Sequence, residues 1–160
     1  MKKRILALTL ALACLFSLSA CQSGGTDQAE APYTTDLVQS IADAGAFSEA
    51  LEPLEGDIAF ALYGLANYGL TLNDLADCAL IRSTGATCEE AAVLIFSGLE
   101  EEQLVQAEQA LKDYIQAQID SNTDYRPAEI PKLEHALVSR RGETFLLVVA
   151  NDLDAAKSVL

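Results

Sequence analysis

Residues 91–120 decide the fold of this chain, and they read AAVLIFSGLEEEQLVQAEQALKDYIQAQID. The first six residues form a short apolar run with β-branched and aromatic side chains, which predicts a strand. Ser97 and Glu100 have the spacing of a capping box, and the glutamates at 100–102 lie at the positive end of the predicted helix dipole. An apolar stripe follows at helical spacing: Leu104, Ala107, Leu111, Tyr114 and Ile115. The stretch therefore predicts a strand and then a long helix that ends near Asp120.

Two predicted hairpins lie on either side of this helix. Residues 77–83 are the partner of 91–96, and the intervening Ser-Thr-Gly-Ala-Thr at 83–87 supplies a turn. Beyond the helix, residues 136–138 and 144–149 are apolar and lie on either side of Arg141-Gly142, which predicts a second hairpin.

Shorter helices complete the predicted domain. Apolar residues recur at helical spacing after Thr34 until Gly45, and less regularly over 57–67. A short turn is expected at 129–132, and Asn151 or Asp152 can cap a terminal helix that reaches Val159. The order predicts an α+β fold: an antiparallel sheet of two hairpins, about four strands, covered on one face by helices, with the long helix between the hairpins.

The amino terminus has the order of a secretory signal. Lys2, Lys3 and Arg4 precede an apolar run over 5–16, and Leu-Ser-Ala leads into Cys21. The run is shorter than the roughly 18 residues that a membrane-spanning helix needs. Leu18-Ser19-Ala20-Cys21 also resembles the bacterial lipobox, in which the cysteine thiol receives a diacylglyceryl group and the preceding peptide is removed. We therefore expect a signal peptide over 1–20 and a lipid anchor on Cys21, with acyl chains such as palmitate holding the protein to the membrane.

The remaining chain is expected to contain a tether and one domain. From Gln22 to about Pro32 the residues are small and polar and cannot bury enough apolar surface to fold, so residues 21–32 are interpreted as the lipidated cysteine and a flexible tether. Residues 33–160 have the size of a single α+β domain.

The charge of the chain excludes one class of partner. The sequence has ten Lys and Arg and 24 Asp and Glu, which gives a formal charge of −14. Because the segment expected to be removed carries three basic residues and no acidic residue, the mature chain has a formal charge of −17. A field of this sign repels nucleic acid, so no nucleic-acid partner is expected.

Two cysteines remain in the predicted domain, Cys78 and Cys88. The compartment would permit a disulfide, but a turn between Thr84 and Gly85 pairs residues whose numbers sum to 169, so Cys78 would face Ala91. We therefore expect two free thiols. The single histidine, His135, has no partner pattern for zinc or for a catalytic triad.

Acidic and polar patterns supply a candidate site without a catalytic assignment. Asp120 to Asp124 resembles the opening of a calcium loop, but Tyr125 replaces the required Gly and Pro131 the required Glu. Adjacent carboxylates in a strand point to opposite faces and do not form an acid-base pair by themselves. The sequence therefore predicts no metal, no cofactor and no catalytic residue. It does predict a candidate binding cluster: Glu89, Glu90, Tyr125, Arg126 and Glu129.

Three segments carry a resemblance to a known family. They are Gly-Ala-Thr-Cys-Glu-Glu-Ala-Ala-Val at 85–93, Tyr-Arg-Pro-Ala-Glu at 125–129, and the closing hairpin at 136–149. Together they resemble the bacterial lipoprotein family catalogued as domain of unknown function 4358, over about residues 35–155. This chain departs from the family pattern at Cys88, where a small residue is usual, and at Ala128. The resemblance implies an exported, lipid-anchored domain and brings no activity or substrate.

Two hypotheses about function follow. The first is a non-enzymatic binding or accessory module, anchored at the cell membrane on the extracytoplasmic side, with an extracytoplasmic protein as its partner. The alternative is a small extracytoplasmic enzyme using Glu90, Tyr125 and Glu129. The two differ in whether these three side chains converge in one concave pocket.

Overall fold

The computed structural model describes residues 30–160, so the predicted signal peptide and Cys21 lie outside the described residues. The strands are β1 (Glu52–Leu54), β2 (Leu75–Arg82), β3 (Glu90–Phe96), β4 (Leu137–Arg141) and β5 (Thr144–Val149). The α-helices are α1 (Asp36–Asp43), α2 (Gly56–Leu62), α3 (Glu101–Asn122), α4 (Ile130–Glu134) and α5 (Leu153–Lys157). Three short 3₁₀ turns are η1 (Leu65–Tyr68), η2 (Leu72–Asp74) and η3 (Pro127–Glu129).

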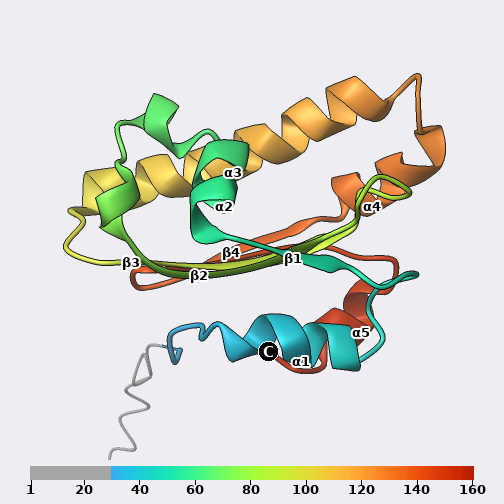
Figure 1. Ribbon diagram of the computed structural model, residues 1–160, viewed down its shortest axis with the longest axis horizontal. Helices are drawn as coiled ribbons and strands as arrows, with labels where there is room; N and C mark the ends of the chain where they lie inside the picture. The colour runs from blue at the N-terminus through green and yellow to red at the C-terminus, as the bar shows by residue number, and fades with distance from the viewer. Residues whose placement is uncertain (1–29) are drawn as a thin grey trace, which may run out of the picture.

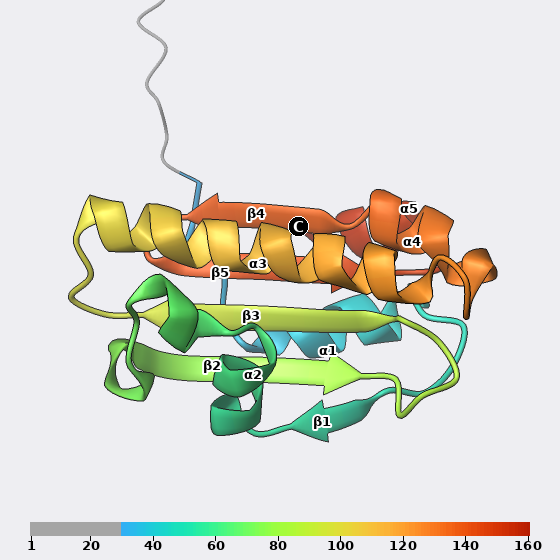
Figure 2. The same ribbon diagram turned by 90° about the horizontal axis from the view of Figure 1, so that it is seen from above.

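The strands form one antiparallel sheet in the order β1-β2-β3-β5-β4 (Figure 2). The α+β class, the two hairpins and the long helix between them are confirmed. The sheet has five strands where about four were expected, because β1 adds a short edge. That strand has only three residues, and its Pro53 cannot donate a hydrogen bond to a sheet, so its sequence carried little strand signal.

Helices cover both faces of the sheet, and the expectation that they cover one face was wrong (Figure 1). On one face, Ala92, Leu94 and Leu147 share a core with α2, α3 and α4. On the other, Val93, Leu146 and neighbouring side chains pack with α1 and α5. Every residue of β5 is buried. Strands that are apolar on both sides need cover on both sides, and their continuous apolar runs are typical of such burial.

The long helix begins slightly later than predicted. Glu100, not Ser97, is its N-cap, and the backbone N–H of Glu100 donates to the Gln103 side chain at 3.1 Å. The predicted stripe is buried, and it faces the sheet and η1. At the end of the chain, Asp152 caps α5 by accepting a hydrogen bond from the Ala155 N–H at 2.9 Å, as expected.

The register of the first hairpin differs from the predicted one. Cys78 faces Leu94, not Ala91, and Ile81 faces Ala91. The turn is not tight, because residues 83–89 form a wide loop that closes with a hydrogen bond from Ser83 N–H to the Glu89 carbonyl at 2.9 Å. Cys78 and Cys88 are free, so the expected thiol state is confirmed although the register was wrong. Burial raises the pKa of the Cys78 thiol to about 12 and also raises that of Cys88.

The chain enters the domain at Tyr33. This residue is buried, its N–H donates to the Thr144 hydroxyl at 2.8 Å, and the Arg141 guanidinium lies 4.3 Å from its ring centroid. Glu30 also pairs with Arg141, at 2.7 Å, but is itself exposed. No helix within residues 30–160 is long and apolar enough to cross a membrane.

Alkylation of the two thiols should depend on folding. Both are shielded and carry raised pKa values, so they should react slowly at neutral pH in the native protein. The denatured, unreduced protein should gain one group on each of Cys78 and Cys88. Mass spectrometry measures the gain. Failure of the denatured protein to gain these groups without reductant would mean that the thiols are bonded.

Deletion of residues 22–32 should leave the domain folded. It removes the exposed ion pair between Glu30 and Arg141, which is worth less than about 1 kcal/mol, and keeps Tyr33 in its place. Thermal unfolding of the deletion variant checks this, with Tyr33→Ala as a control that should lower the midpoint clearly. A drop of the same size in both variants would show that the segment before Tyr33 packs on the domain.

Candidate functional site

The wide loop between β2 and β3, residues 83–89, gathers most of the predicted cluster. The loop lies beside η3 and α4 at one end of the sheet (Figure 1). Arg82 ends β2, Glu90 begins β3, and the chain after α3 brings Arg126, Glu129 and Lys132 to the loop. The site therefore combines residues 82–90 with residues 126–132, which are far apart in the sequence.

Glu89 is fully buried, and its carboxylate is surrounded by donors. It accepts hydrogen bonds from the Ser48 N–H at 2.8 Å and from the Ser48 hydroxyl at 2.7 Å, and the Lys132 ammonium lies 2.7 Å away. A buried charge is tolerated only when it is paired and hydrogen-bonded in this way. Glu89 thus ties the segment before β1 and helix α4 to the β2–β3 loop.

Glu129 completes the same network from the other side of Lys132. One of its carboxylate oxygens accepts a hydrogen bond from the Cys88 N–H at 2.9 Å, and the other lies 3.2 Å from the Lys132 ammonium. Although burial favours the neutral amine, hydrogen bonds to Glu89 and Glu129 hold the pKa of Lys132 above its usual value. Lys132 is therefore a charged bridge between the two carboxylates.

Glu90 has a separate set of partners. The Tyr114 hydroxyl donates to it at 3.0 Å, and Arg82 Nε lies 3.1 Å from its carboxylate. Burial raises the pKa of Glu90 to about 7, although Arg82 and Tyr114 oppose the shift. Tyr63 also faces this cluster, with its ring 4.9 Å from that of Tyr114 in an edge-to-face arrangement. Glu89 and Glu90 therefore have no partner in common.

Arg126 and Tyr125 differ sharply in position. The guanidinium of Arg126 donates to Asn122 Oδ1 at 2.9 Å and to the carbonyl of Gly85 at 3.0 Å, which attaches the end of α3 to the loop. Tyr125 is 87% exposed. The structure thus brings Glu89, Glu90, Arg126 and Glu129 around one loop, whereas Tyr125 lies outside the network.

Sequence reasoning missed several residues of the network. Ser48, Arg82, Tyr114 and Lys132 are all partners of the two buried glutamates. Lys132 had a weak signal, since it follows Glu129 by three residues and the segment is helical. Glu49 was also missed; hydrogen bonds from the hydroxyls of Ser83 and Thr87 hold its pKa below its usual value.

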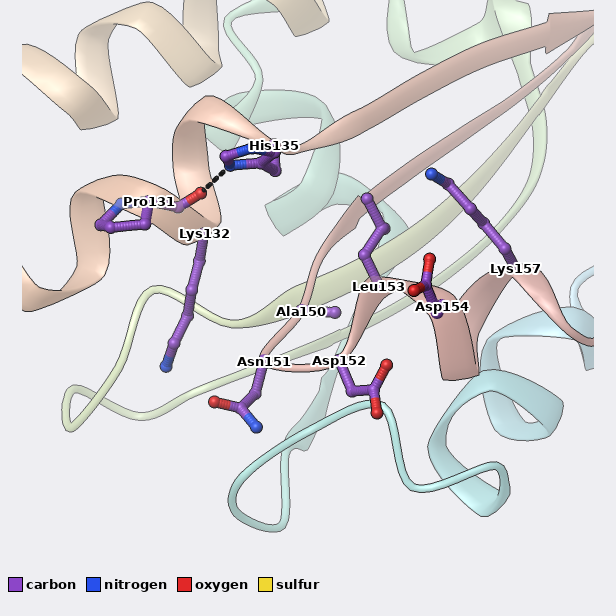
Figure 3. A pocket seen from close by; sticks show the side chains of 9 residues that line it. All are labelled: Pro131, Lys132, His135, Ala150, Asn151, Asp152, Leu153, Asp154 and Lys157. Atoms are coloured by element: carbon purple, nitrogen blue, oxygen red, sulfur yellow. Dashed lines mark hydrogen bonds between the residues drawn. The ribbon is translucent and has the colours of Figure 1, made fainter.

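An open pocket of about 480 Å³ lies next to the network, between α4 and the start of α5 (Figure 3). Lys132 lines it from one side and Lys157 from the other, with Asp152 and Asp154 between them. The Nδ1–H of His135 donates to the Pro131 carbonyl at 2.7 Å, so its other ring nitrogen is the one left for a ligand. The pocket therefore carries both signs of charge.

The calcium-like pattern is not a loop in the folded protein. Residues Asp120 and Ser121 lie in the last turn of α3, where the Ser121 hydroxyl donates to the Ala117 carbonyl at 2.7 Å. Within residues 30–160, no group of three or more His, Cys, Asp or Glu side chains is arranged to hold a metal ion.

Comparison with protein families places the loop and most of its partners in a known domain. A family model described as "Domain of unknown function (DUF4358)" matches residues 65–150, more than half of the chain. The match runs from η1 to the end of β5 and includes Glu89, Glu90, Arg126 and Glu129. No curated protein and no solved structure matches this chain.

The buried carboxyl of Glu90 should make stability depend on pH. Because its folded pKa lies near 7 against 4.5 for the free group, its contribution to stability is full below about pH 4.5 and is lost as the pH rises through 7. Relative to the wild type, Glu90→Gln should therefore gain up to about 3 kcal/mol between pH 5 and pH 8. Urea unfolding at both values measures the difference. Glu108→Gln, which removes a surface ion pair with Lys112, should shift by less than about 1 kcal/mol, and an equally flat result for Glu90→Gln would contradict the assignment.

Proposed function

Because this chain belongs to the family described as Domain of unknown function (DUF4358), we propose its role from its own residues: a membrane-anchored extracytoplasmic lipoprotein whose domain is a non-enzymatic binding or accessory module. The anchor is proposed on Cys21, after removal of residues 1–20. The domain would then act by contact at the outer face of the cell membrane.

The observation that carries the proposal is how the candidate side chains are used. Glu89 and Glu129 share Lys132, Glu90 is paired with Arg82, and Arg126 holds loop carbonyls. Groups that react with a substrate need access to it, yet Glu89 and Glu90 have exposed fractions of 0% and 1%. The network is suited to stiffening a loop, which favours recognition over catalysis.

The rival enzyme hypothesis required Glu90, Tyr125 and Glu129 to converge. Their exposed fractions are 1%, 87% and 9%, and Glu90 and Glu129 have different hydrogen-bond partners. An acid-base pair needs two carboxyl groups facing one substrate, and this arrangement offers none in that position. It supports the binding module over the enzyme.

The place where Tyr33 joins the domain also supports a binding role for the end of the sheet that carries the β2–β3 loop. Tyr33 is bonded to Thr144, which faces Ile95 near the last residue of β3, whereas the loop precedes the first residue, Glu90. The seven residues of β3 span about 20 Å at about 3.4 Å per residue. The loop end therefore lies away from the side where the tether joins the domain, and is open to partners.

Membrane retention and partner capture test the proposal together. The wild type should be found in the membrane fraction, accessible to protease added outside the cell, and should incorporate radiolabelled palmitate. Cys21→Ala should lose the label and be released or misprocessed, because diacylglyceryl transfer needs the thiol. Equal labelling of Cys21→Ala would show that the anchor is elsewhere.

The binding role has its own readout. Cross-linking in intact cells followed by purification from solubilised membranes should recover a defined partner with the wild type. A swap of residues 84–87 for Gly-Gly-Ser-Ser keeps Gly85, whose φ is 136°, and a hydroxyl at position 87, and it should abolish the recovery without loss of folding. If the partner is recovered equally with the swapped loop, the loop end is not the recognition surface.

A further inference from the structure

A second pocket, of about 350 Å³, lies on the outer side of the β2–β3 loop. It is formed by β1, the end of β2, the loop and Arg126, which directly precedes η3. Its lining residues are Glu52, Leu54, Arg82, Ser83, Thr84, Gly85, Thr87 and Arg126. Two of the ten basic residues of the sequence therefore line one pocket, in a protein with a formal charge of −14.

Each guanidinium group uses some of its N–H donors in contacts within the domain and leaves others without a partner among residues 30–160. Arg82 uses Nε to contact Glu90, and Arg126 uses Nε and Nη1 to donate to Asn122, Gly85 and Thr87. The two terminal nitrogens of Arg82 and the Nη2 of Arg126 have no hydrogen-bond partner among residues 30–160. A guanidinium has five N–H donors in a planar fork, so donors are left over on each.

The anchoring contacts of Arg126 are to neutral oxygens. Among residues 30–160 it has no carboxylate within ion-pair distance, unlike Arg82, Arg140 and Arg141. Its positive charge is therefore not neutralised by a direct partner. The one acidic residue that lines the pocket is Glu52, on the exposed edge strand, against two guanidiniums.

Rigidity makes these donors suitable for recognition. The loop that carries the pocket is braced by Glu49 through Ser83 and Thr87, and by Glu129 through the Cys88 N–H. Pre-organised donors lose little entropy on binding, and a guanidinium recognises carboxylate or phosphate oxygens through two parallel hydrogen bonds. The exposed hydroxyl of Thr84 adds a further donor at the rim.

We propose that this Arg82–Arg126 pocket binds an oxyanion, a phosphate or carboxylate group carried by a small solute or by a partner's side chain or terminus. The inference rests on the proposed binding function and names the chemistry of its ligand. Arg82 and Arg126 donate to the oxygens, and Thr84 contacts the ligand at the rim. The buried ion network is the support that holds the two guanidiniums at the pocket.

The test changes the charge of the pocket without touching the network. Thr84 is exposed and has no hydrogen-bond partner among residues 30–160, so Thr84→Asp places a carboxylate at the rim while every contact of Arg82 and Arg126 is kept. Gln106→Glu, at an exposed position on α3, adds the same charge elsewhere and is the matched control. Thr84→Lys has the opposite sign and replaces the first variant if that one does not fold.

The ¹⁵N-labelled full chain, lipidated and in non-ionic detergent, is titrated with inorganic phosphate and separately with acetate, at constant ionic strength set by sodium chloride. The expected result is a saturable shift of the Nε–H signals of Arg82 and Arg126 and of the amides at 84–87. Thr84→Asp should weaken this binding roughly tenfold, Thr84→Lys should tighten it, and Gln106→Glu should change it less than about twofold.

Phosphate bound more tightly than acetate identifies a phosphate-bearing ligand, and the reverse identifies a carboxylate. The proposal is overturned if neither anion gives a saturable shift at these signals, or if Thr84→Asp and Gln106→Glu bind equally well. Partner recovery that persists while anion binding is absent would overturn the oxyanion site alone and leave the binding role standing.

Discussion

The pairing of β3 with β5 is the constraint on which the rest of the structure depends. Both strands are apolar on both faces, and their six paired positions join the two hairpins at the centre of the sheet. Such a pair can be buried only if a layer of helices covers each side. The long helix α3 supplies one layer with α2 and α4, and α1 with α5 supplies the other. The short edge strand β1 then needs little apolar surface of its own.

Burying the start of β3 also creates the charge problem that shapes the loop end. Glu89 and Glu90 are buried together with the start of this strand. An unpaired carboxylate there would be strongly destabilising. The partners that resolve this come from different segments of the chain: Lys132, Arg82, Tyr114 and Ser48. The network therefore does structural work that a hydrophobic residue could also do. What it adds is a fixed geometry for the loop and for the cations around it.

Two open pockets lie beside the β2–β3 loop, and the same buried ion network supports both of them. Lys132 lines the pocket toward α5, and Arg82 and Arg126 line the pocket toward β1. In a chain of strongly negative charge, a partner with an acidic surface would be repelled at most places. At the end opposite Tyr33, Arg126 has no carboxylate within ion-pair distance among residues 30–160, so its charge is the one available to the proposed ligand. The acidity of the remaining surface then favours solubility and discourages contacts elsewhere.

The sequence by itself determined the kinds of element and their order, because strand and helix periodicity and helix caps are local properties. The helix after residue 100, both hairpins and the cap at Asp152 all follow from neighbours a few residues apart. Tertiary structure decided the register of the first hairpin, the edge strand, the second helical layer and the partners of the glutamates. Glu89 contacts Ser48 and Lys132, which are 41 and 43 residues away, and no local pattern encodes such pairs. Tyr125 lies beside Arg126 in the chain, yet only Arg126 turns toward the loop, because donors and carbonyls that meet in the folded state hold it there.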